Sequence, residues 1–246
     1  MDTAAASGAD TVLWCPGAWA AAAVSRHRNL RLSSAGPRWL DHLPAAVTGR
    51  EVDTATVGQL RAILPVAETA RVFAKFPETK HERFEARVRS PEELAADLDQ
   101  LPESEPVQLQ SPVRFDYEVR CWVLGAKVVA HAVYFPGAPR EEWAGLEHPA
   151  RSAAAVKWLG RVLAAGDVTV PDAVVVDAGW CTDPVVGPPG WRIVEANAAW
   201  SADWYIPDAM DAVVATVAAS QLGVSDRWRW RPSPLLVHCS KALARR

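Results

Sequence analysis

The stretch 191–197 (Trp-Arg-Ile-Val-Glu-Ala-Asn) constrains the possible folds of this chain more than any other segment. It begins like a buried strand, but Glu195 and Asn197 follow two residues apart. Alternate side chains of a strand point to the same face of a sheet, so these two polar groups share a face. They can satisfy backbone groups at the end of the strand, or they can belong to a polar site. Taken alone, the pair favours the first interpretation, because such pairs are common by chance.

The order of the predicted elements favours an α+β protein with a mainly antiparallel sheet and helices packed on it. The pair Gly125-Ala126 predicts a hairpin turn between two strands. Ser90 and Pro91 are typical of the beginning of a helix. Further strands are predicted at 71–76, 107–110, 173–177 and 191–197, and helices at 57–64, 91–101, 150–165 and 208–222.

A candidate metal site combines Asp177 with Glu195 and Asn197. Two carboxylates and an amide are typical ligands for Mg²⁺ and not for zinc. The simplest hairpin, with its turn at 187–190, places Asp177 opposite Trp200, three residues beyond Asn197. An irregular register is also expected because of the residues 181–184, which include a proline.

Two lysines form a second candidate set. Lys75 lies within the apolar strand 71–76, and lysine is seldom buried without a partner. It could bind phosphate as a point charge, or it could lie on the wet face of a half-buried strand. Lys80 follows in a polar loop, where the alternative is a solvated surface lysine.

A third set lies on the strand that precedes Gly125. Glu118 and Arg120 share one face of this strand, where they could serve a ligand. The alternative is a surface ion pair of small energetic value. The three sets together are the parts that a site for ATP and Mg²⁺ requires. The Walker A, G-x-G-x-x-G and G-x-S-x-G patterns are absent from the sequence.

Residues 71–222 resemble the ATP-grasp superfamily, and within it a small bacterial clade named for one arginine and two lysines. The motifs that carry the resemblance are Phe73-Ala-Lys-Phe-Pro-Glu-Thr-Lys80, Glu118-Val-Arg-Cys-Trp-Val123 and Val194-Glu-Ala-Asn-Ala-Ala-Trp-Ser201. The resemblance implies an ATP-grasp fold, in which two α+β subdomains with antiparallel sheets clasp the nucleotide. We expect a reduced pre-ATP-grasp region at 1–70, the ATP-grasp domain at 71–225 and a basic, Trp-rich tail at 226–246.

The resemblance also implies roles for individual residues, with ATP and Mg²⁺ as cofactors. Lys75 and Lys80 would contact the phosphates, and Lys80 and Arg120 would be catalytic, with Arg120 stabilising the transferred phosphoryl group. The adenine would be read by the backbone of Gln108, Leu109 and Gln110, Glu118 would lie near the ribose or the metal, and Asp177, Glu195 and Asn197 would bind one or two Mg²⁺ ions.

The implied activity is ATP- and Mg²⁺-dependent ligation of a carboxylate to an amine or thiol through an acyl phosphate. One departure concerns the segment 77–89, which contains no glycine where many family members have a glycine-rich phosphate loop. Arg83, Arg87 and Arg89 could cover the phosphates there instead. The departure also motivates an alternative, a nucleotide-binding module or adaptor that has lost ligase turnover.

Charge and composition narrow the expected partners and location. A net charge of −3 gives no indication of nucleic-acid binding, and no apolar run approaches the ~20 residues that span a membrane. The 4 cysteines are far apart and fit reduced thiols, so we expect a cytoplasmic protein. The expected partners are ATP and a small-molecule or peptide carboxylate and amine. Tryptophans of the C-terminal third could line a cleft for carbohydrate or peptide, or pack in the core.

Overall fold

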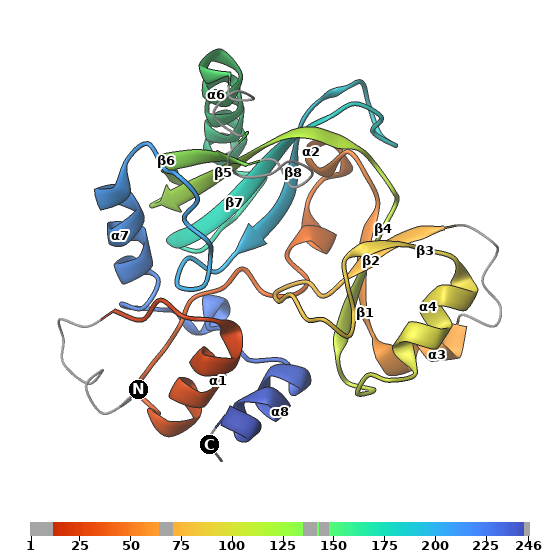
Figure 1. Cartoon of the computed structure of the whole chain (residues 1–246). Coiled ribbons are helices and arrows are strands. Elements are labelled where there is room, and N and C mark those ends of the chain that lie inside the picture. The colour runs from red at the N-terminus through yellow and green to blue at the C-terminus, as the bar shows by residue number, and fades with distance from the viewer. Residues whose placement is uncertain (1–11, 64–70, 135–141, 143–147, 244–246) are drawn as a thin grey trace.

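Two four-stranded antiparallel sheets form the framework of the chain (Figure 1). The computed structural model describes residues 12–63, 71–134, 142 and 148–243. The strand order is β1-β4-β2-β3 in the first sheet and β6-β5-β7-β8 in the second. This arrangement, with helices packed against the sheets, confirms the predicted α+β class.

The first sheet consists of β1 (Val52–Thr56), β2 (Val72–Lys75), β3 (Arg87–Arg89) and β4 (Pro106–Gln110). Helices α3 (Val57–Ile63) and α4 (Pro91–Leu98) complete this half, and their leucines pack with Ala74, Phe76 and Val107 in one buried cluster. Ser90 forms a capping box with Glu93, which confirms the predicted beginning of α4. Because β1 is an edge strand of this sheet, residues before Arg71 contribute directly to it.

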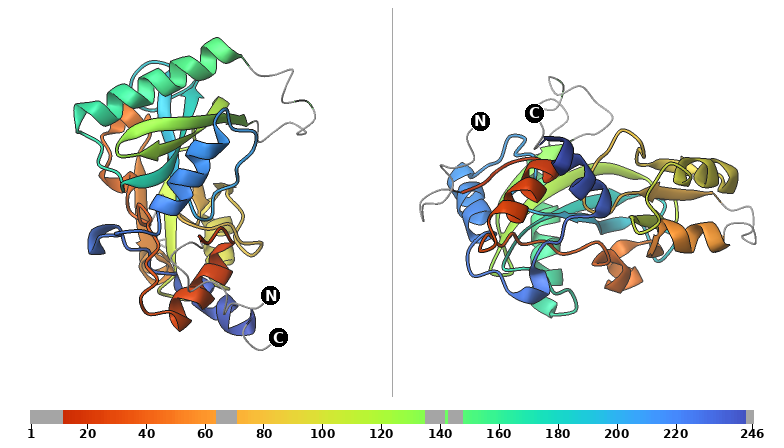
Figure 2. Two further views of the ribbon diagram at one scale, coloured as in Figure 1. Left: turned by 90° about the vertical axis from the view of Figure 1, so that its left-hand side faces the viewer. Right: turned by 90° about the horizontal axis from the view of Figure 1, so that it is seen from below.

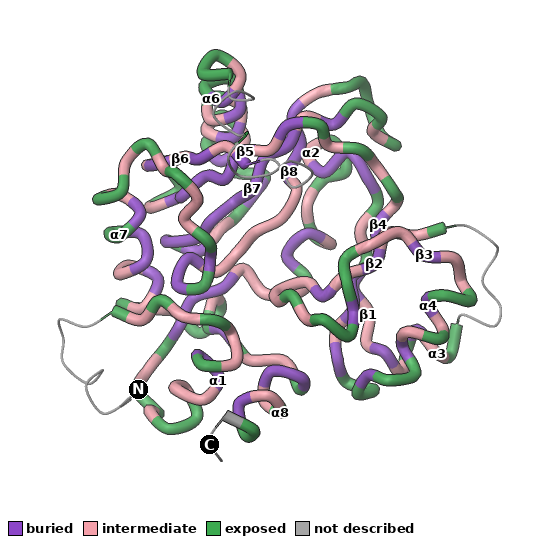
Figure 3. The backbone as a smooth tube through the Cα atoms, viewed as in Figure 1, coloured by how far each residue is buried: buried purple, intermediate pink, exposed green. Residues whose placement is uncertain are grey.

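The second sheet consists of β5 (Phe115–Leu124), β6 (Lys127–Tyr134), β7 (Ala173–Cys181) and β8 (Gly190–Asn197). Helix α6 (Pro149–Ala165) covers one face, where Val119, Cys121 and Val176 are buried. Helix α7 (Met210–Ala219) packs against part of the other face, on Trp122 and Val175. Figure 3 shows the resulting run of buried backbone along β5 and β7. The remainder of the α7 face carries the polar groups of the site.

The two ends of the described chain pack together below the sheets. Helices α1 (Gly17–Arg26) and α8 (Pro234–Leu243) lie side by side (Figure 2). Their shared cluster contains Trp200 and Trp230, whose rings meet edge to face with centroids 4.7 Å apart. These two tryptophans, with 1% and 6% of their surface exposed, are core residues. The division at 70 and 225 stays a prediction.

The remaining short elements are η2 (Leu40–His42), α2 (Ala45–Thr48) and η5 (Asp226–Trp228). Helix α2 packs against β8 and leads through Gly49 into β1. Within the described residues, no helix combines the length and the apolar composition needed to cross a membrane.

Candidate functional site

Three charged side chains lie in one row across the second sheet. The strand register places Arg120 opposite Asp177, and Asp177 opposite Glu195. The expectation that Asp177 lies opposite Trp200 is therefore wrong. It assumed a tight turn at 187–190, whereas β7 continues to Cys181 and pairs with Gly190, which leaves a longer loop between the strands.

A β-bulge in β8 completes this alignment. Ile193 pairs with Ala178 and Glu195 pairs with Asp177, so Val194 is an extra residue without a partner on β7. A bulge of this kind changes the direction of the side chains that follow it. Here it brings Glu195 level with Asp177.

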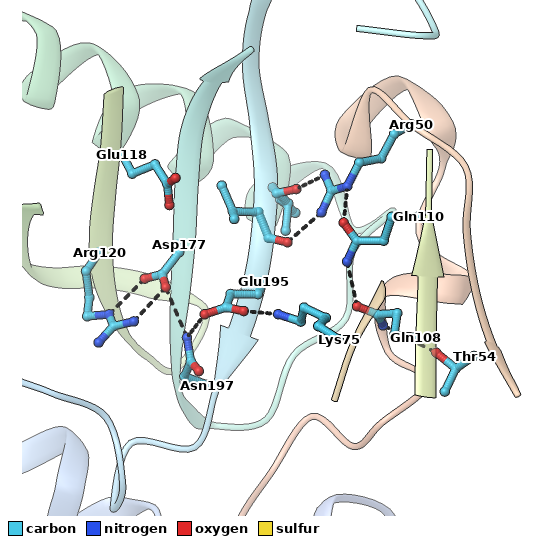
Figure 4. A network of polar contacts seen from close by, with 12 residues as sticks. Arg50, Thr54, Lys75, Gln108, Gln110, Glu118, Arg120, Asp177, Glu195 and Asn197 are labelled. Carbon is cyan, nitrogen blue, oxygen red and sulfur yellow. Dashed lines mark hydrogen bonds and ion pairs between the residues drawn. The ribbon is translucent and has the colours of Figure 1, made fainter. Parts of the chain in front are cut away.

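Asn197 joins the two carboxylates. Its Nδ2 donates to Oδ2 of Asp177 and to Oε1 of Glu195, each at 3.0 Å. Figure 4 shows the three side chains converging between β7 and β8. The structure thus brings together the three predicted metal ligands, in a place where the Asp177 side chain is fully buried and that of Glu195 is 18% exposed.

Lys75 reaches the cluster from the other sheet. Its ammonium forms an ion pair with Oε2 of Glu195, and its side chain is only 13% exposed. Burial acts to raise the pKa of Glu195, but the ammonium of Lys75 outweighs it and holds that pKa below the ordinary range. Lys75 is therefore a paired, largely buried cation between the sheets and does not lie on a wet strand face.

Arg120 closes the opposite end of the row. Its guanidinium binds Asp177 with two hydrogen bonds, of 2.9 Å from Nε and 2.7 Å from Nη2. It also lies beside the rings of Tyr134 and Tyr205, which stack on each other, at 5.4 and 4.8 Å from their centroids. Burial acts to lower the pKa of Arg120, but the Asp177 carboxylate outweighs it, and the net pKa rises. Arg120 is thus a firmly held cation, and it lies at the far end of the row from Lys75 (Figure 4).

Glu118 lies one position along the same face of β5, at the edge of this network. Tyr134 donates a 2.5 Å hydrogen bond to its carboxylate. Burial raises the pKa of Glu118 to about 7, and the nearby charges of Asp177 and Glu195 add to the effect. A carboxyl group that titrates near neutral pH thus adjoins the predicted metal ligands.

The strand β4 does not present its backbone as expected. Gln108, Leu109 and Gln110 pair with β1 on one side and with β2 on the other. Their backbone groups are used within the sheet, so the expected backbone contact with adenine at these residues is not supported. The two glutamines of this strand contact each other through their buried side chains, where Nε2 of Gln110 donates to Oε1 of Gln108 at 2.8 Å.

Arg50 is a member of the network that the sequence pattern did not predict. It is 2% exposed, and it binds the Gln110 side chain and two carbonyl groups of β8. Nothing in the segment Thr-Gly-Arg before β1 resembles a site motif, so only the fold reveals this position.

Lys80 does not join the row formed by Arg120, Asp177 and Glu195 through a hydrogen bond or ion pair in the described part of the chain. It lies exposed in the loop after β2, and none of its side-chain contacts within the described residues ties it to the carboxylates of the site. The proposed phosphate-covering arginines differ in their positions. Arg87 pairs with Glu93 and Asp97. The fully buried Arg89 binds Asp97 and the carbonyl groups of Ala74 and Glu85, so neither arginine is a free phosphate ligand. Arg83 is exposed in the loop that also carries Lys80.

The loop that carries Lys80 is tied down through Glu78, whose carboxyl group receives a hydrogen bond from the hydroxyl of Ser34. Burial raises the pKa of Glu78 from 4.5 to about 7, and the bond from Ser34 only partly opposes this effect. The folded state therefore prefers the protonated carboxyl. The stabilising contribution is complete below pH 4.5 and is lost as the pH rises to about 7.

Glu78→Gln is expected to make stability less dependent on pH in this window. At about pH 7.5 the variant should exceed the wild type by about 1–3 kcal/mol in the free energy of unfolding, because it carries no charge to bury. Near pH 4.5 the two should be equal. Urea unfolding at both pH values measures this difference, and a variant that is less stable than the wild type at the higher pH contradicts the assignment.

The donor set fits a Mg²⁺ ion that is shared with a phosphate chain. No group of three or more His, Cys, Asp or Glu side chains in the described part of the chain could hold a metal by itself. Asp177 and Glu195 provide two carboxylates and Asn197 an amide. Mg²⁺ commonly takes one or two carboxylates and completes its shell with water and substrate phosphates. The cations Lys75 and Arg120 flank this set through their ion pairs with Glu195 and Asp177.

The fold and the site together define an α+β protein in which two antiparallel sheets meet at a buried, charged row. Residues 16–219 match the model of an ATP-grasp domain family, the third family of the clade named for one arginine and two lysines. The match covers most of the 246-residue sequence, so the chain belongs to this ATP-grasp family. The predicted resemblance and fold are thereby confirmed. ATP-grasp proteins are generally ATP-dependent ligases that use ATP and Mg²⁺.

Three kinds of protein are among the solved structures whose backbones align with this chain. The RimK domain protein ATP-grasp from Sphaerobacter thermophilus has a TM-score of 0.44 and 18% identity, over 87% of this chain and 80% of that one. The ATP-grasp ligase PsnB complexed with minimal precursor has a TM-score of 0.38 and 16% identity, over 70% of this chain and 56% of that one. Cdc123 from Schizosaccharomyces pombe has a TM-score of 0.40 and 11% identity, over 68% of this chain and 83% of that one. The chain spans about half the length of the PsnB structures. No curated protein shows a significant match.

Proposed function

We propose that the chain is an ATP- and Mg²⁺-dependent ligase that joins a carboxylate to an amine or thiol through an acyl phosphate. The observation that carries this proposal is the row in which Lys75 of one sheet meets Glu195, Asn197 and Asp177 of the other. A cation and an oxygen-rich metal set at the junction of two sheets are what a clasped Mg²⁺-nucleotide needs.

The proposed roles follow the positions of the side chains. Asp177, Glu195 and Asn197 would hold Mg²⁺, which neutralises charge on the phosphates when it is bound. Lys75 would bind the phosphate chain as a point charge, and its present bond to Glu195 supports its position within reach of the metal ligands. Lys80 remains a proposed second phosphate ligand on the loop that leads away from β2.

Arg120 is proposed to act at the phosphoryl group through its place beside Asp177. Both carboxylate oxygens of Asp177 bind its Nε and Nη2, and its Nη1 donates to the carbonyl of Asp203 at 3.2 Å. Because these bonds fix the two groups relative to each other, the first proposed contribution of Arg120 is to orient the carboxylate of Asp177. Glu118 is proposed to lie near the ribose or the metal, and the side chains of Gln108 and Gln110 to support the strand beside Lys75.

In the proposed reaction a carboxylate oxygen attacks the γ-phosphorus of ATP. The bond from this phosphorus to the bridging oxygen breaks, and ADP leaves. An amine nitrogen then attacks the acyl carbon, phosphate leaves with the former carboxylate oxygen, and the nitrogen loses a proton. The protein contributes positioning and charge stabilisation, and no covalent bond to a side chain is required.

The use of a small-molecule or peptide carboxylate and amine, the cytoplasmic location and the absence of nucleic-acid or membrane partners stay predictions. An alternative is a nucleotide-binding module without turnover. It is favoured by β3, which follows the loop of Lys80 and in which Arg87 and Arg89 are engaged in contacts of their own.

Release of ADP and phosphate distinguishes the two functions. The purified chain is incubated with ATP, Mg²⁺ and a panel of carboxylates combined with amines, including peptides. Turnover that requires both a carboxylate and an amine supports the ligase. Tight binding of Mg²⁺-ATP with no release of phosphate across the panel supports the module, and absence of nucleotide binding contradicts both.

A further inference from the structure

Arg50 connects the two sheets through a buried side chain. Its Nε donates to Oε1 of Gln110 at 2.7 Å, on β4 of the first sheet. Its Nη1 donates at 2.9 Å to the carbonyl of Ile193, and its Nη2 donates at 2.7 Å to the carbonyl of Val194, both on β8. A further 2.9 Å bond from Nη1 reaches the carbonyl of Thr48. The guanidinium thus spans the junction between the sheets, and Figure 4 shows its bond to Gln110.

The β8 end of this connection is the bulge itself. Val194 is the extra residue of the bulge, so its carbonyl group needs a partner other than the regular pairing with β7. Arg50 supplies that partner and binds the neighbouring carbonyl of Ile193 as well. The bulge aligns Glu195 with Asp177, and Arg50 therefore stabilises the backbone geometry on which that alignment depends.

The other end of the connection leads toward Lys75. Gln110, which accepts from Arg50, donates to the Gln108 side chain at 2.8 Å. Gln108 is the residue paired with Lys75 across β4 and β2. The strand that carries the lysine and the strand that carries the metal ligands are thus tied by one chain of hydrogen bonds.

The backbone before Arg50 packs closely against the loop before β8. Gly49 has a φ of 70°, and a Cβ there would lie 2.9 Å from the side chain of Arg192. Its carbonyl group accepts bonds from Val185 and Val186 in the loop before β8. Burial lowers the pKa of Arg50 to about 10, which still leaves a cation at neutral pH.

We propose that Arg50 is a positioning residue that couples the Mg²⁺ site on β8 to the phosphate-binding Lys75 on β2. The inference rests on the proposed function, since it assigns Arg50 to the same nucleotide site. Arg50 contacts neither metal ligand side chains nor Lys75, and it acts through the bulge and through Gln110. The alternative is a purely structural role in holding the segment before β1.

The test measures how much Mg²⁺ strengthens the binding of a non-hydrolysable ATP analogue. Calorimetric titrations with Mg²⁺ and with EDTA give this ratio for the wild type and for Arg50→Met. We expect the ratio to fall by about 10–100-fold in the variant, the range typical of residues that orient metal ligands. A purely structural arginine lowers the melting temperature and leaves the ratio unchanged in the folded protein.

Two further variants keep the result decisive. Gln110→Leu removes the bond to the first sheet while the bulge carbonyls keep Arg50, so it should lower the ratio even where Arg50→Met does not fold. Arg61→Met is the matched control, because Arg61 binds the carbonyl groups of Leu98 and Leu101 within the first half alone. Its ratio should equal that of the wild type.

The outcomes separate the inference from the proposed function. No strengthening by Mg²⁺ in the wild type overturns the proposed function and with it the coupling. Strengthening in the wild type that persists unchanged in the folded Arg50→Met or Gln110→Leu protein overturns the role of Arg50 alone. A reduced ratio in these variants with a normal ratio in Arg61→Met supports it.

Discussion

Lys75→Met is expected to weaken the binding of an ATP analogue by roughly 10–100-fold, because hydrogen bonds to charged groups contribute about 1.5–3 kcal/mol. The variant should also lose about 3–5 kcal/mol of stability, since Glu195 then loses the cation that compensates its largely buried charge. Calorimetry in EDTA measures the first effect without a contribution from metal binding, and urea unfolding measures the second.

The double variant Lys75→Met/Glu195→Gln separates a nucleotide site from a structural ion pair. Removal of both charges should restore much of the stability and leave the nucleotide affinity in EDTA as weak as in the single variant. Lys157→Met, which alters an exposed lysine on α6, serves as the control. If the double variant binds the analogue as tightly as the wild type, Lys75 is a structural partner of Glu195 and no phosphate ligand.

Arg120→Met is expected to lower the free energy of unfolding by about 3–5 kcal/mol, because it leaves the carboxylate of Asp177 buried without its bidentate partner. Urea unfolding monitored by tryptophan fluorescence measures the loss. The effect is large because the Asp177 side chain is completely buried and cannot be screened by water.

The matched control is Arg151→Met. Arg151 pairs with Asp116 at 3.0 Å, but both side chains are about one-third exposed, so its loss should cost less than about 1 kcal/mol. The double variant Arg120→Met/Asp177→Leu should recover most of the stability lost in Arg120→Met, since an apolar pair of similar size needs no compensation. Equal losses for Arg120→Met and Arg151→Met would contradict the buried ion pair.

Local sequence signals predicted most elements of the fold. Apolar alternation and the Gly125-Ala126 turn identify β5 and β6, and Ser90 with Pro91 identifies the beginning of α4. These predictions succeed because each signal acts within a few residues of its effect. The boundaries shift by a few residues where tertiary pairing extends a strand, as at β7, which was predicted to end at Asp177 and continues to Cys181.

The site was predicted less completely, because its geometry depends on contacts between distant segments. The carboxylates and the amide are recognisable as a set, but the register that aligns Asp177 with Glu195 arises from a bulge at Val194, whereas the sequence indicated an irregular register only through residues 181–184. The pairing of β4 on both sides and the bridge made by Arg50 likewise require the assembled sheets.

The central claim is that the charged row between the sheets is a Mg²⁺-nucleotide site. Calorimetric titration of a non-hydrolysable ATP analogue, with Mg²⁺ and with EDTA, tests it most directly in the wild type and in Glu195→Gln. We predict that Mg²⁺ tightens binding to the wild type by about tenfold or more, at least about 1.4 kcal/mol, and that this gain is absent in the variant. An equal gain in both proteins, or no nucleotide binding by the folded wild type, would contradict the claim.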